Sequence, residues 1–459
     1  MSKCPCCGGE LSYSAGESKV VCPYCKTSFN PSELNTKTKF SKEQKTFEGK
    51  SYHCSQCGAT LLTFDETAIT FCSYCGSQSV IESKMVKVNS PDFVIPFSIT
   101  REECIKLYKK YVNNSLFAPN YMKENVAIEK FRGIYMPYSI YKATFHGINN
   151  NKGEKYSGSR GNYSYYDIFT IKAQVDAEYT GISYDLLSKF YDDYSMSIPF
   201  DYKGVMPFNK NYLMGFYADM KDVDETLYDQ RVIDITSKDA SKHLSKRKEY
   251  MKYGCLKPTL RTSIEERKTG MFPVYFLAIK DKSNKIHYAI INGQNGKMAI
   301  DLPIDFKKFI LGTLLLSILI FGILYFGDVI LPKTVLIFSL MMSILSIAIS
   351  TNQLNKIHEK EHHLKDRGYI YSDSRRLDTE TKSKKKIKFK DIAKQVFAII
   401  ISVVILCINT INDEIYYGGA VAVFVLIVLS FKDLIKEHNI LTSNKPPQLE
   451  KRGGEEYGK

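Results

Sequence analysis

Two pairs of cysteines in the arrangement C-x2-C…C-x2-C occur twice near the start of this chain, and this repeat constrains the fold strongly. Two residues between paired cysteines allow a tight turn to aim both sulfurs at one ion, and two such turns complete a tetrahedral zinc site. The sequence therefore predicts two zinc ribbons, at residues 1–30 and 51–82, each holding one structural zinc ion. The predicted ligands are Cys4, Cys7, Cys22, Cys25, Cys54, Cys57, Cys72 and Cys75.

The surroundings of these cysteines favour structural metal sites over disulfides or catalytic centres. The chain opens with MSKCPCC and not with an apolar run, so the N-terminal part is expected in a reducing cytosol. Four thiolates fill each site and leave no position for a catalytic water. About thirty residues bury too little apolar surface to fold alone, so the metal is expected to supply most of each ribbon's stability.

The residue after each cysteine pair carries a conformational prediction. Gly8, Gly58 and Gly76 follow the second cysteine of a pair, where a positive φ is expected and costs glycine little. Lys26 takes this place after the remaining pair, Cys22 and Cys25, and we expect it to adopt the same backbone conformation at a cost of about 1 kcal/mol.

The charge distribution decides between two kinds of anionic partner. Lys and Arg total 63 against 49 Asp and Glu, a formal net charge of +14, which suggests nucleic acid or a lipid surface. Residues 51–81 contain no Lys or Arg at all but include Asp65 and Glu66. Because a phosphate-binding surface needs cations, the ribbons favour protein contact and argue against nucleic acid.

A polar segment at 31–50 is expected to be a flexible linker, and residues 91–303 are expected to form an α+β cytosolic domain. Thr100 and Glu103 form a capping box for a helix that carries Ile105, Tyr108 and Val112 at helical intervals.

Strands are expected at 131–148 and 163–179, with Pro137 at an edge or bulge, and a hairpin turn at Asn295–Gly296 closes the domain. The tyrosines within 163–166 could offer a stacking platform, although aromatic alternation in a strand favours packing. No catalytic constellation emerges from the scattered histidines of this domain, so no enzyme activity is predicted.

Four uncharged, mostly aliphatic runs follow, at 309–326, 335–351, 396–411 and 416–431. The first, with eighteen residues, makes about 27 Å of helix, which is near the short end for a membrane span. Buried core helices are the alternative. The runs contain no Asp, Glu, Lys, Arg or His, so they are interpreted as anchors without an ion path.

The charges between the runs predict the topology. The sequence divides into a hairpin at 309–351, a basic loop at 352–394, a second hairpin at 395–431 and a tail at 432–459. Because positively charged loops stay in the cytoplasm, we expect a multi-pass plasma-membrane protein with four spans and both termini cytoplasmic. Six lysines before the third span are candidates for binding anionic lipid head groups. They are Lys382, Lys384, Lys385, Lys386, Lys388 and Lys390.

A second metal-binding pattern lies in the basic loop. His358, Glu359 and His362 spell H-E-x-x-H, which on a helix can bind zinc and supply a general base. A solvated run of mixed charge without a third ligand is the competing interpretation. The pattern leaves a membrane metalloprotease open as an alternative function.

The order of motifs resembles a family of double zinc-ribbon membrane proteins of Gram-positive bacteria. The resemblance covers about residues 1–330 and depends on the paired CxxCG turns, VIPFSITREE (94–103), FRGIYMPYSIY (131–141), FPVYFL (272–277) and INGQNGK (291–297). It implies a role in phage-shock-protein-A-type envelope-stress systems, recruiting that peripheral membrane protein and contacting related stress-operon membrane proteins. This chain lacks the tryptophans expected within FRGIYMPYSIY and FPVYFL, and it adds the second membrane hairpin.

The sequence thus predicts a multidomain protein: two small zinc ribbons, an α+β soluble domain and a C-terminal all-α membrane region of four helices. The expected function is a non-enzymatic scaffold that docks partner proteins at the cytoplasmic face of the membrane. A membrane-tethered nucleic-acid-binding protein, related to replication or transcription, is the first alternative, and the metalloprotease is the second.

Overall fold

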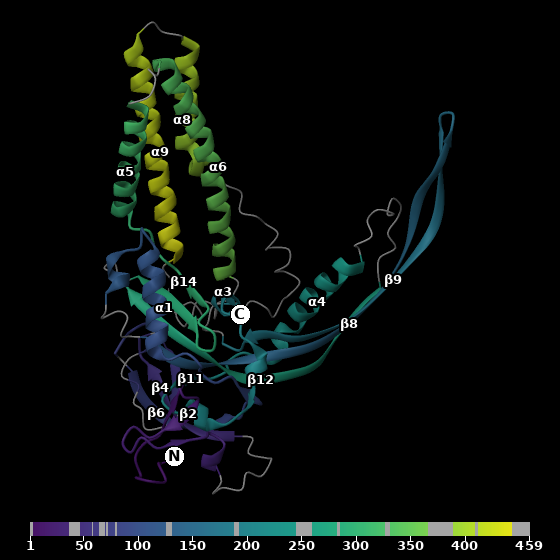
Figure 1. Cartoon of the computed structure of the whole chain (residues 1–459), viewed down its shortest axis with the longest axis vertical. Coiled ribbons are helices and arrows are strands. Elements are labelled where there is room, and N and C mark those ends of the chain that lie inside the picture. Colours follow the sequence, from purple (N-terminus) through teal and green to yellow (C-terminus); the bar gives the residue numbers. More distant parts are fainter. Residues whose placement is uncertain are drawn as a thin grey trace, which may run out of the picture.

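Figure 1 shows a computed structural model of the chain, in which a sheet-rich body carries C-terminal helices at one end and a long β-hairpin beside them. The structure describes residues 3–35, 46–56, 58–63, 69, 72–78, 80–124, 131–187, 192–244, 259–281, 285–325, 331–365, 389–408 and 412–442. The term "body" is used below for the described residues before α5, whose bounds are given with the other C-terminal helices.

The body contains two sheets. The smaller is antiparallel and has the order β1-β2-β3, with bounds Ser12–Ser14, Lys19–Val21 and Ser28–Phe29. The larger has eleven strands in the order β10-β7-β12-β8-β11-β5-β4-β6, with β13 and β14 continuing from β12 and β9 pairing with β8. Its strands are β4 Thr46–Cys54, β5 Thr60–Thr63, β6 Val80–Asn89, β7 Phe93–Val94, β8 Arg132–Arg160, β9 Tyr163–Asp185, β10 Met206–Pro207, β11 Tyr217–Asp219, β12 Thr259–Lys280, β13 Ile286–Asn292 and β14 Met298–Ile300.

The second ribbon is part of this larger sheet. Its strands β4, β5 and β6 pair with one another, and β5 pairs with β11 of the body, where Leu61 lies opposite Asp219. β4 begins at Thr46, so the linker predicted at 31–50 ends earlier than expected. The ribbon therefore shares its backbone hydrogen bonds with the domain that follows it.

The helices of the body include the one predicted from its capping box. In α1 (Arg101–Asn114) the Glu103 N–H donates to Thr100 Oγ1 at 3.2 Å, and the Thr100 N–H donates to Glu103 Oε2 at 2.9 Å. The buried positions are Cys104, Tyr108 and Val112, one turn apart, and Ile105 is only partly buried. The other body helices are α3 (Asp192–Ser197) and α4 (Asp229–Leu244), with 3-10 turns at Glu33–Asn35, Asn120–Lys123, Tyr202–Gly204, Lys210–Leu213 and Glu225–Tyr228.

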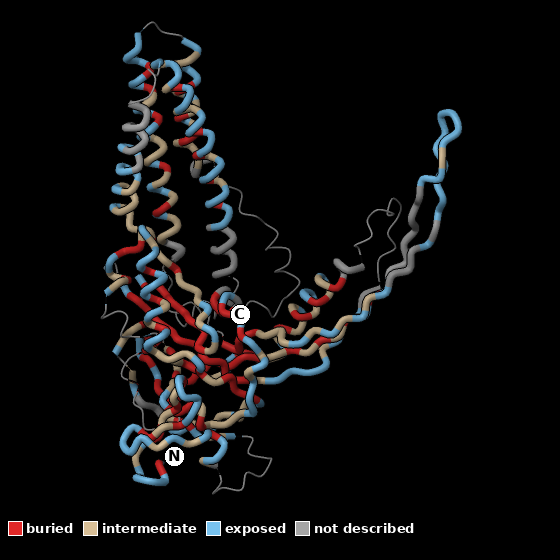
Figure 2. Tube along the Cα trace, viewed as in Figure 1, coloured by how far each residue is buried: buried red, intermediate tan, exposed pale blue. Residues whose placement is uncertain are grey.

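The sheet is buried on both faces. Along β12, Phe272, Val274 and Phe276 belong to one hydrophobic cluster, while Met271 and Tyr275 belong to the other. This alternation follows from the two-residue period of a strand. Figure 2 shows the buried residues concentrated in this part of the molecule.

The predicted strands form the long pair β8–β9, and Pro137 lies inside the sheet, contrary to expectation. β8 pairs with β11 at Ile134 and Tyr135, and with β9 from Tyr138 onward, so Pro137 lies where the partner changes. The Pro137 carbonyl accepts from the Leu186 N–H at 2.9 Å. Because the nitrogen of a strand residue points to the same side as its carbonyl, the missing N–H falls at this change of partner.

The outer part of β8–β9 extends beyond the rest of the sheet as a two-stranded arm. β12 begins at Thr259, opposite Ile148, and among the described strands residues 149–173 pair only with each other. The arm turns at Gly161, whose φ is +60°. Tyr163, Tyr165 and Tyr166 are exposed and do not pack in a hydrophobic core, although the Tyr166 ring contacts the Tyr156 ring across the pair of strands.

Helices occupy all four of the apolar runs. They are α5 (Phe306–Tyr325), α6 (Pro332–Lys365), α8 (Phe389–Ile408) and α9 (Asp413–Thr442). Within them, Pro332–Lys356 and Asp413–Asn439 are long and apolar enough to cross a membrane, and Ile392–Ile408 is a shorter apolar helix. α6, α8 and α9 pack against one another, and α5 meets α9 where the Phe309 and Phe431 rings lie 6.4 Å apart.

Candidate metal centres

The first ribbon brings all four predicted sulfurs together. The Sγ atoms of Cys4, Cys7, Cys22 and Cys25 lie within 4.8 Å of one another, with 3.6 Å between Cys4 and Cys25 and 3.5 Å between Cys7 and Cys22. A tetrahedron with Zn–S bonds of about 2.3 Å has edges of about 3.8 Å, so the group has the right size. An all-sulfur donor set is consistent with zinc.

The second ribbon forms a similar group from its described cysteines. The sulfurs of Cys54, Cys72 and Cys75 lie within 4.8 Å of one another, and Cys54 and Cys75 are 3.7 Å apart. Cys57, the fourth predicted ligand, lies outside the described residues. Both cysteine groups can therefore hold a metal ion.

The same backbone turn recurs at the cysteine pairs and explains why the sulfurs converge. The N–H of the residue after each pair donates to the carbonyl of the pair's first cysteine, at 2.8 Å for Gly8, Lys26, Gly58 and Gly76. Their φ angles lie between +58° and +74°, which confirms the prediction for all four positions. Lys26 is therefore a lysine in a conformation that favours glycine.

The two groups differ in their exposure to solvent. In the first ribbon, Cys4 and Cys22 are buried, whereas Cys7 and Cys25 are exposed. In the second, Cys54, Cys72 and Cys75 are all buried. Hydrogen bonds from the Thr27 hydroxyl and the Thr27 N–H lower the pKa of the Cys25 thiol to about 6. Against a hydrogen bond from the Gly9 N–H, hydrogen bonds with Cys22 and Cys25 raise the pKa of the Cys7 thiol to about 12.

Sequence reasoning missed how the second centre is held in the core. Tyr74, between two of its cysteines, is fully buried and donates a short hydrogen bond to Asp219. Its carbonyl accepts from the Tyr288 hydroxyl at 3.0 Å, and its ring lies 5.2 Å from that of Phe276. Burial, followed by the Asp219 charge, raises the pKa of Tyr74, so its hydroxyl keeps its proton and remains a donor.

The first ribbon attaches to the opposite face of the sheet. Leu11, Tyr13 and Val20 belong to the cluster that contains Phe97 and Tyr108. The Tyr13 N–H donates to the Met214 carbonyl at 3.0 Å. The Pro31 carbonyl accepts from the side-chain amides of Asn209 at 2.9 Å and Asn211 at 2.7 Å. The body thus contributes apolar contacts as well as hydrogen bonds to the ribbon's stability.

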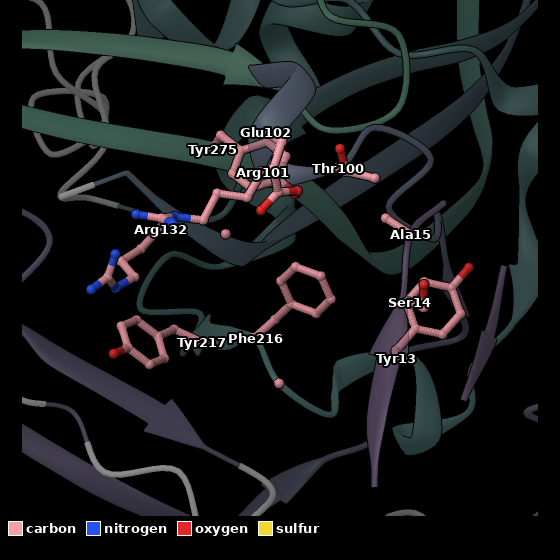
Figure 3. A pocket seen from close by; sticks show the side chains of 12 residues that line it. Tyr13, Ser14, Ala15, Thr100, Arg101, Glu102, Arg132, Phe216, Tyr217 and Tyr275 are labelled. Atoms are coloured by element: carbon pink, nitrogen blue, oxygen red, sulfur yellow. The ribbon is translucent and has the colours of Figure 1, made fainter. Parts of the chain in front are cut away.

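A pocket of about 490 Å³ lies between the first ribbon and the body, and residues of both line it. Figure 3 shows Tyr13 and Ser14 of β1 on one side, with Arg101 and Arg132 on the other. The guanidinium groups of both arginines donate to the Phe131 carbonyl, at 3.1 Å and 2.9 Å respectively. Glu102 also lines this side, so the wall where the ribbon meets the start of α1 carries two guanidinium groups and one carboxylate.

The remaining predicted site residues lie largely outside the described residues. Lys382, Lys384, Lys385, Lys386 and Lys388 fall in the undescribed segment 366–388, and Lys390 lies in the first turn of α8. His358, Glu359 and His362 lie in the last turns of α6. The lipid-binding and metalloprotease interpretations therefore stay predictions.

Comparison with known proteins finds one distant relative. The chain is similar to a protein of Bacillus subtilis (strain 168) described as uncharacterized protein YdjG, with 25% identity over 310 residues. The similarity covers 66% of this chain and 89% of the relative. No family model matches the chain. No solved structure matches it.

Proposed function

We propose that this protein is a non-enzymatic scaffold of the plasma membrane, anchored by four helices, whose zinc-ribbon body docks protein partners at the cytoplasmic face. The observation that carries the proposal is the inverted polarity of the C-terminal helices. In water, a helical bundle buries apolar side chains and exposes polar ones. These helices expose large apolar side chains and bury several polar ones among them.

Large apolar side chains cover the outside of the helices. Exposed residues include Leu315 and Ile318 on α5, Phe338 and Met341 on α6, Phe397 and Val404 on α8, and Val421 and Phe424 on α9. A contiguous exposed surface of this kind needs an apolar environment, and a lipid bilayer supplies one on all sides. This supports four spans, although only α6 and α9 reach the usual length.

Polar side chains lie between the helices. Ser343, Ser346 and Ser350 of α6 are buried, as are Ser402 of α8 and Ser430 of α9. Gln395 of α8 donates to Ser350 at 3.0 Å and also to Ser430, so one amide joins three helices. Small residues and interhelical hydrogen bonds hold helices together in membranes, where lipid removes the hydrophobic driving force.

The orientation proposed from the charges is compatible with the fold. In Figure 1 the start of α5 and the end of α9 lie beside the body, so both termini belong on one side of the membrane. Cysteine groups suited to zinc belong in a reducing compartment, which makes this side the cytoplasm. The lysines at 382–390 would then face the anionic inner leaflet.

Accessible thiols can test the orientation in intact cells. Asp413→Cys, at the end of the helices away from the body, should react with a membrane-impermeant maleimide added outside. Glu102→Cys, on the body, should react only after lysis; both positions are exposed in the structure. Labelling of Glu102→Cys in intact cells would contradict the proposed topology.

Co-purification can test the scaffold role. The resemblance proposes a phage-shock-protein-A-like peripheral protein as partner, so the full chain, extracted in mild detergent, should retain such a protein through washing. Cys25→Ser, which disturbs the first ribbon, should weaken retention, whereas Cys6→Ser at a neighbouring exposed thiol should not. Recovery of nucleic acid in place of protein, with binding lost as salt rises, would favour the alternative function.

A further inference from the structure

We infer that the segment at the end of α1 is a second membrane contact, in which Leu116 enters the cytoplasmic leaflet and nearby lysines bind anionic head groups. The inference rests on the proposed membrane anchoring and adds a lipid-binding surface on the body. This surface is named the α1 tip and consists of Lys110, Tyr111 and Leu116, together with Lys307 in the first turn of α5.

Contacts with α5 fix the position of the α1 tip relative to the helices. The Phe117 carbonyl accepts from the Asp305 N–H at 2.8 Å. The Phe117 ring lies 5.4 Å from the Phe309 ring, and a Cβ added at Gly312 would lie 3.1 Å from it. The segment after α1 therefore reaches the first turn of the apolar run that begins at Phe309.

The charges of α5 place the edge of the proposed bilayer at this level. Lys307 and Lys308 are the last charged residues before the run 309–326, so the span begins directly after them. The Lys308 ammonium donates to the Ala118 carbonyl at 2.6 Å and to Asn120 Oδ1 at 2.7 Å, which ties the segment after α1 to the same turn. Figure 1 shows α1 running from the body toward the start of α5.

Leu116 presents an apolar side chain at this level. It is 79% exposed, the largest fraction among the large hydrophobic side chains of the described residues. A single exposed leucine is common on a protein surface in water. Here, however, adjacent Cα atoms are only about 3.8 Å apart, so Leu116 lies at nearly the depth of Phe117. The lipid that surrounds the first turn of the span can therefore cover Leu116 as well.

The charge around Leu116 fits an anionic membrane surface. Lys110 and Tyr111 are exposed on α1, and Lys307 is exposed on α5. An apolar side chain beside exposed lysines is typical of segments that lie in the membrane interface, where anionic lipids attract the lysines and the apolar group enters the acyl boundary. Residues 104–123 contain no Asp or Glu but four lysines: Lys106, Lys109, Lys110 and Lys123.

The absence of tryptophan from the chain allows a direct test. Leu116→Trp introduces a single fluorophore, and Tyr111→Trp is a second version in case the first disturbs the turn. The full chain is reconstituted in phosphatidylcholine–phosphatidylglycerol vesicles whose acyl chains are brominated near the glycerol backbone. Phe338→Trp on the exposed surface of α6 is the positive control. Glu102→Trp, exposed at the other end of α1 and about 20 Å away along the helix axis, is the matched negative control.

Tryptophan at position 116 should lose most of its emission in these vesicles and far less when the bromines lie near the methyl ends of the acyl chains. Glu102→Trp should be unaffected by either lipid. Quenching of Phe338→Trp without quenching at position 116 or 111 would overturn the inference while leaving the anchor intact. Loss of quenching at Phe338→Trp as well would instead refute the membrane anchoring itself.

The role of the lysines is tested in the Leu116→Trp background. Omitting phosphatidylglycerol, or adding Lys110→Glu, should reduce the quenching, whereas Lys19→Glu at an exposed position of the first ribbon should not. Quenching that ignores both changes would overturn the assignment to anionic lipid. Emission that lipid does not quench, but that shifts to shorter wavelength when a co-purified protein is added, would assign the surface to a protein partner instead.

Discussion

The two ribbons have the same local turn and opposite surroundings. Tyr24 and Tyr74 occupy equivalent positions, each directly before the last cysteine of its ribbon, yet Tyr24 is 74% exposed and Tyr74 is completely buried. The first ribbon adds its own small sheet to one face of the body, and the second contributes strands to the large sheet and cysteines to the core on the other face. The motif thus determines the metal site, whereas the residues around it determine what depends on the metal.

The largest difference between the two ribbons is expected when one of their cysteine ligands is replaced. Cys75→Ser should unfold much of the body, because a structural zinc site contributes about 10–16 kcal/mol in isolated fingers and the second site lies inside the core. Cys25→Ser should loosen only the first ribbon. Limited proteolysis and zinc content measure both effects, with one zinc expected to remain in Cys25→Ser. Equal damage from the two substitutions would show that the ribbons are structurally equivalent.

Replacing the two equivalent tyrosines should lower the free energy of unfolding by amounts that differ by several kcal/mol. Tyr74→Ala removes a fully buried ring and should lower the free energy of unfolding by about 3–5 kcal/mol. Tyr24→Ala should change it by no more than about 0.5 kcal/mol, as is typical of exposed positions. Thermal unfolding in detergent provides the measurement. A large loss in Tyr24→Ala would show that the first ribbon is covered in the native protein.

A smaller effect should follow from weakening the acceptor of Tyr74. Asp219→Asn keeps the shape of the side chain but removes the negative charge from the group that accepts the Tyr74 hydrogen bond. It should lower the free energy of unfolding by about 1–3 kcal/mol. In a Tyr74→Phe background the same substitution should cost less, because the shared hydrogen bond is already gone. Additive costs would mean that Asp219 acts through other groups.

The smallest effect concerns the lysine with positive φ. Lys26→Gly should stabilise the first ribbon by up to about 1 kcal/mol, since glycine adopts a φ of +58° without steric cost. Gly76→Ala in the second ribbon should destabilise it by a similar amount. Zinc retention against a competing chelator measures both. A weaker hold on zinc in Lys26→Gly would indicate that the lysine side chain supports the site.

Local features were predictable from the sequence because each depends on neighbouring residues. The positive φ angles, the capping box at Thr100 and the turn at Gly296 follow from residue type and short spacing. The four helices follow from runs of apolar residues, although their insertion in a membrane stays a prediction.

Features that depend on distant pairing were not predictable. Leu61 meets Asp219 and Tyr74 meets Tyr288 across long stretches of chain, and no local pattern marks these partners. The tyrosine alternation in β9 indicated a strand correctly but not its exposure, since exposure depends on where β12 begins. The expectation that zinc supplies most of each ribbon's stability did not include the packing of Leu11 and Val20 against the body, which also contributes.

The side-chain amide of Asn439, near the end of α9, joins that helix to the segment that leads into α5. It donates to the Ile304 carbonyl and accepts from the Ile304 N–H, both at 2.8 Å, as a neighbouring strand would. The chain thus enters and leaves the helices through one joint beside β14. Under the proposed anchoring, any tilt or lateral compression of the helices would be delivered at this joint to β14 at the edge of the sheet, which would connect the body mechanically to the surrounding bilayer.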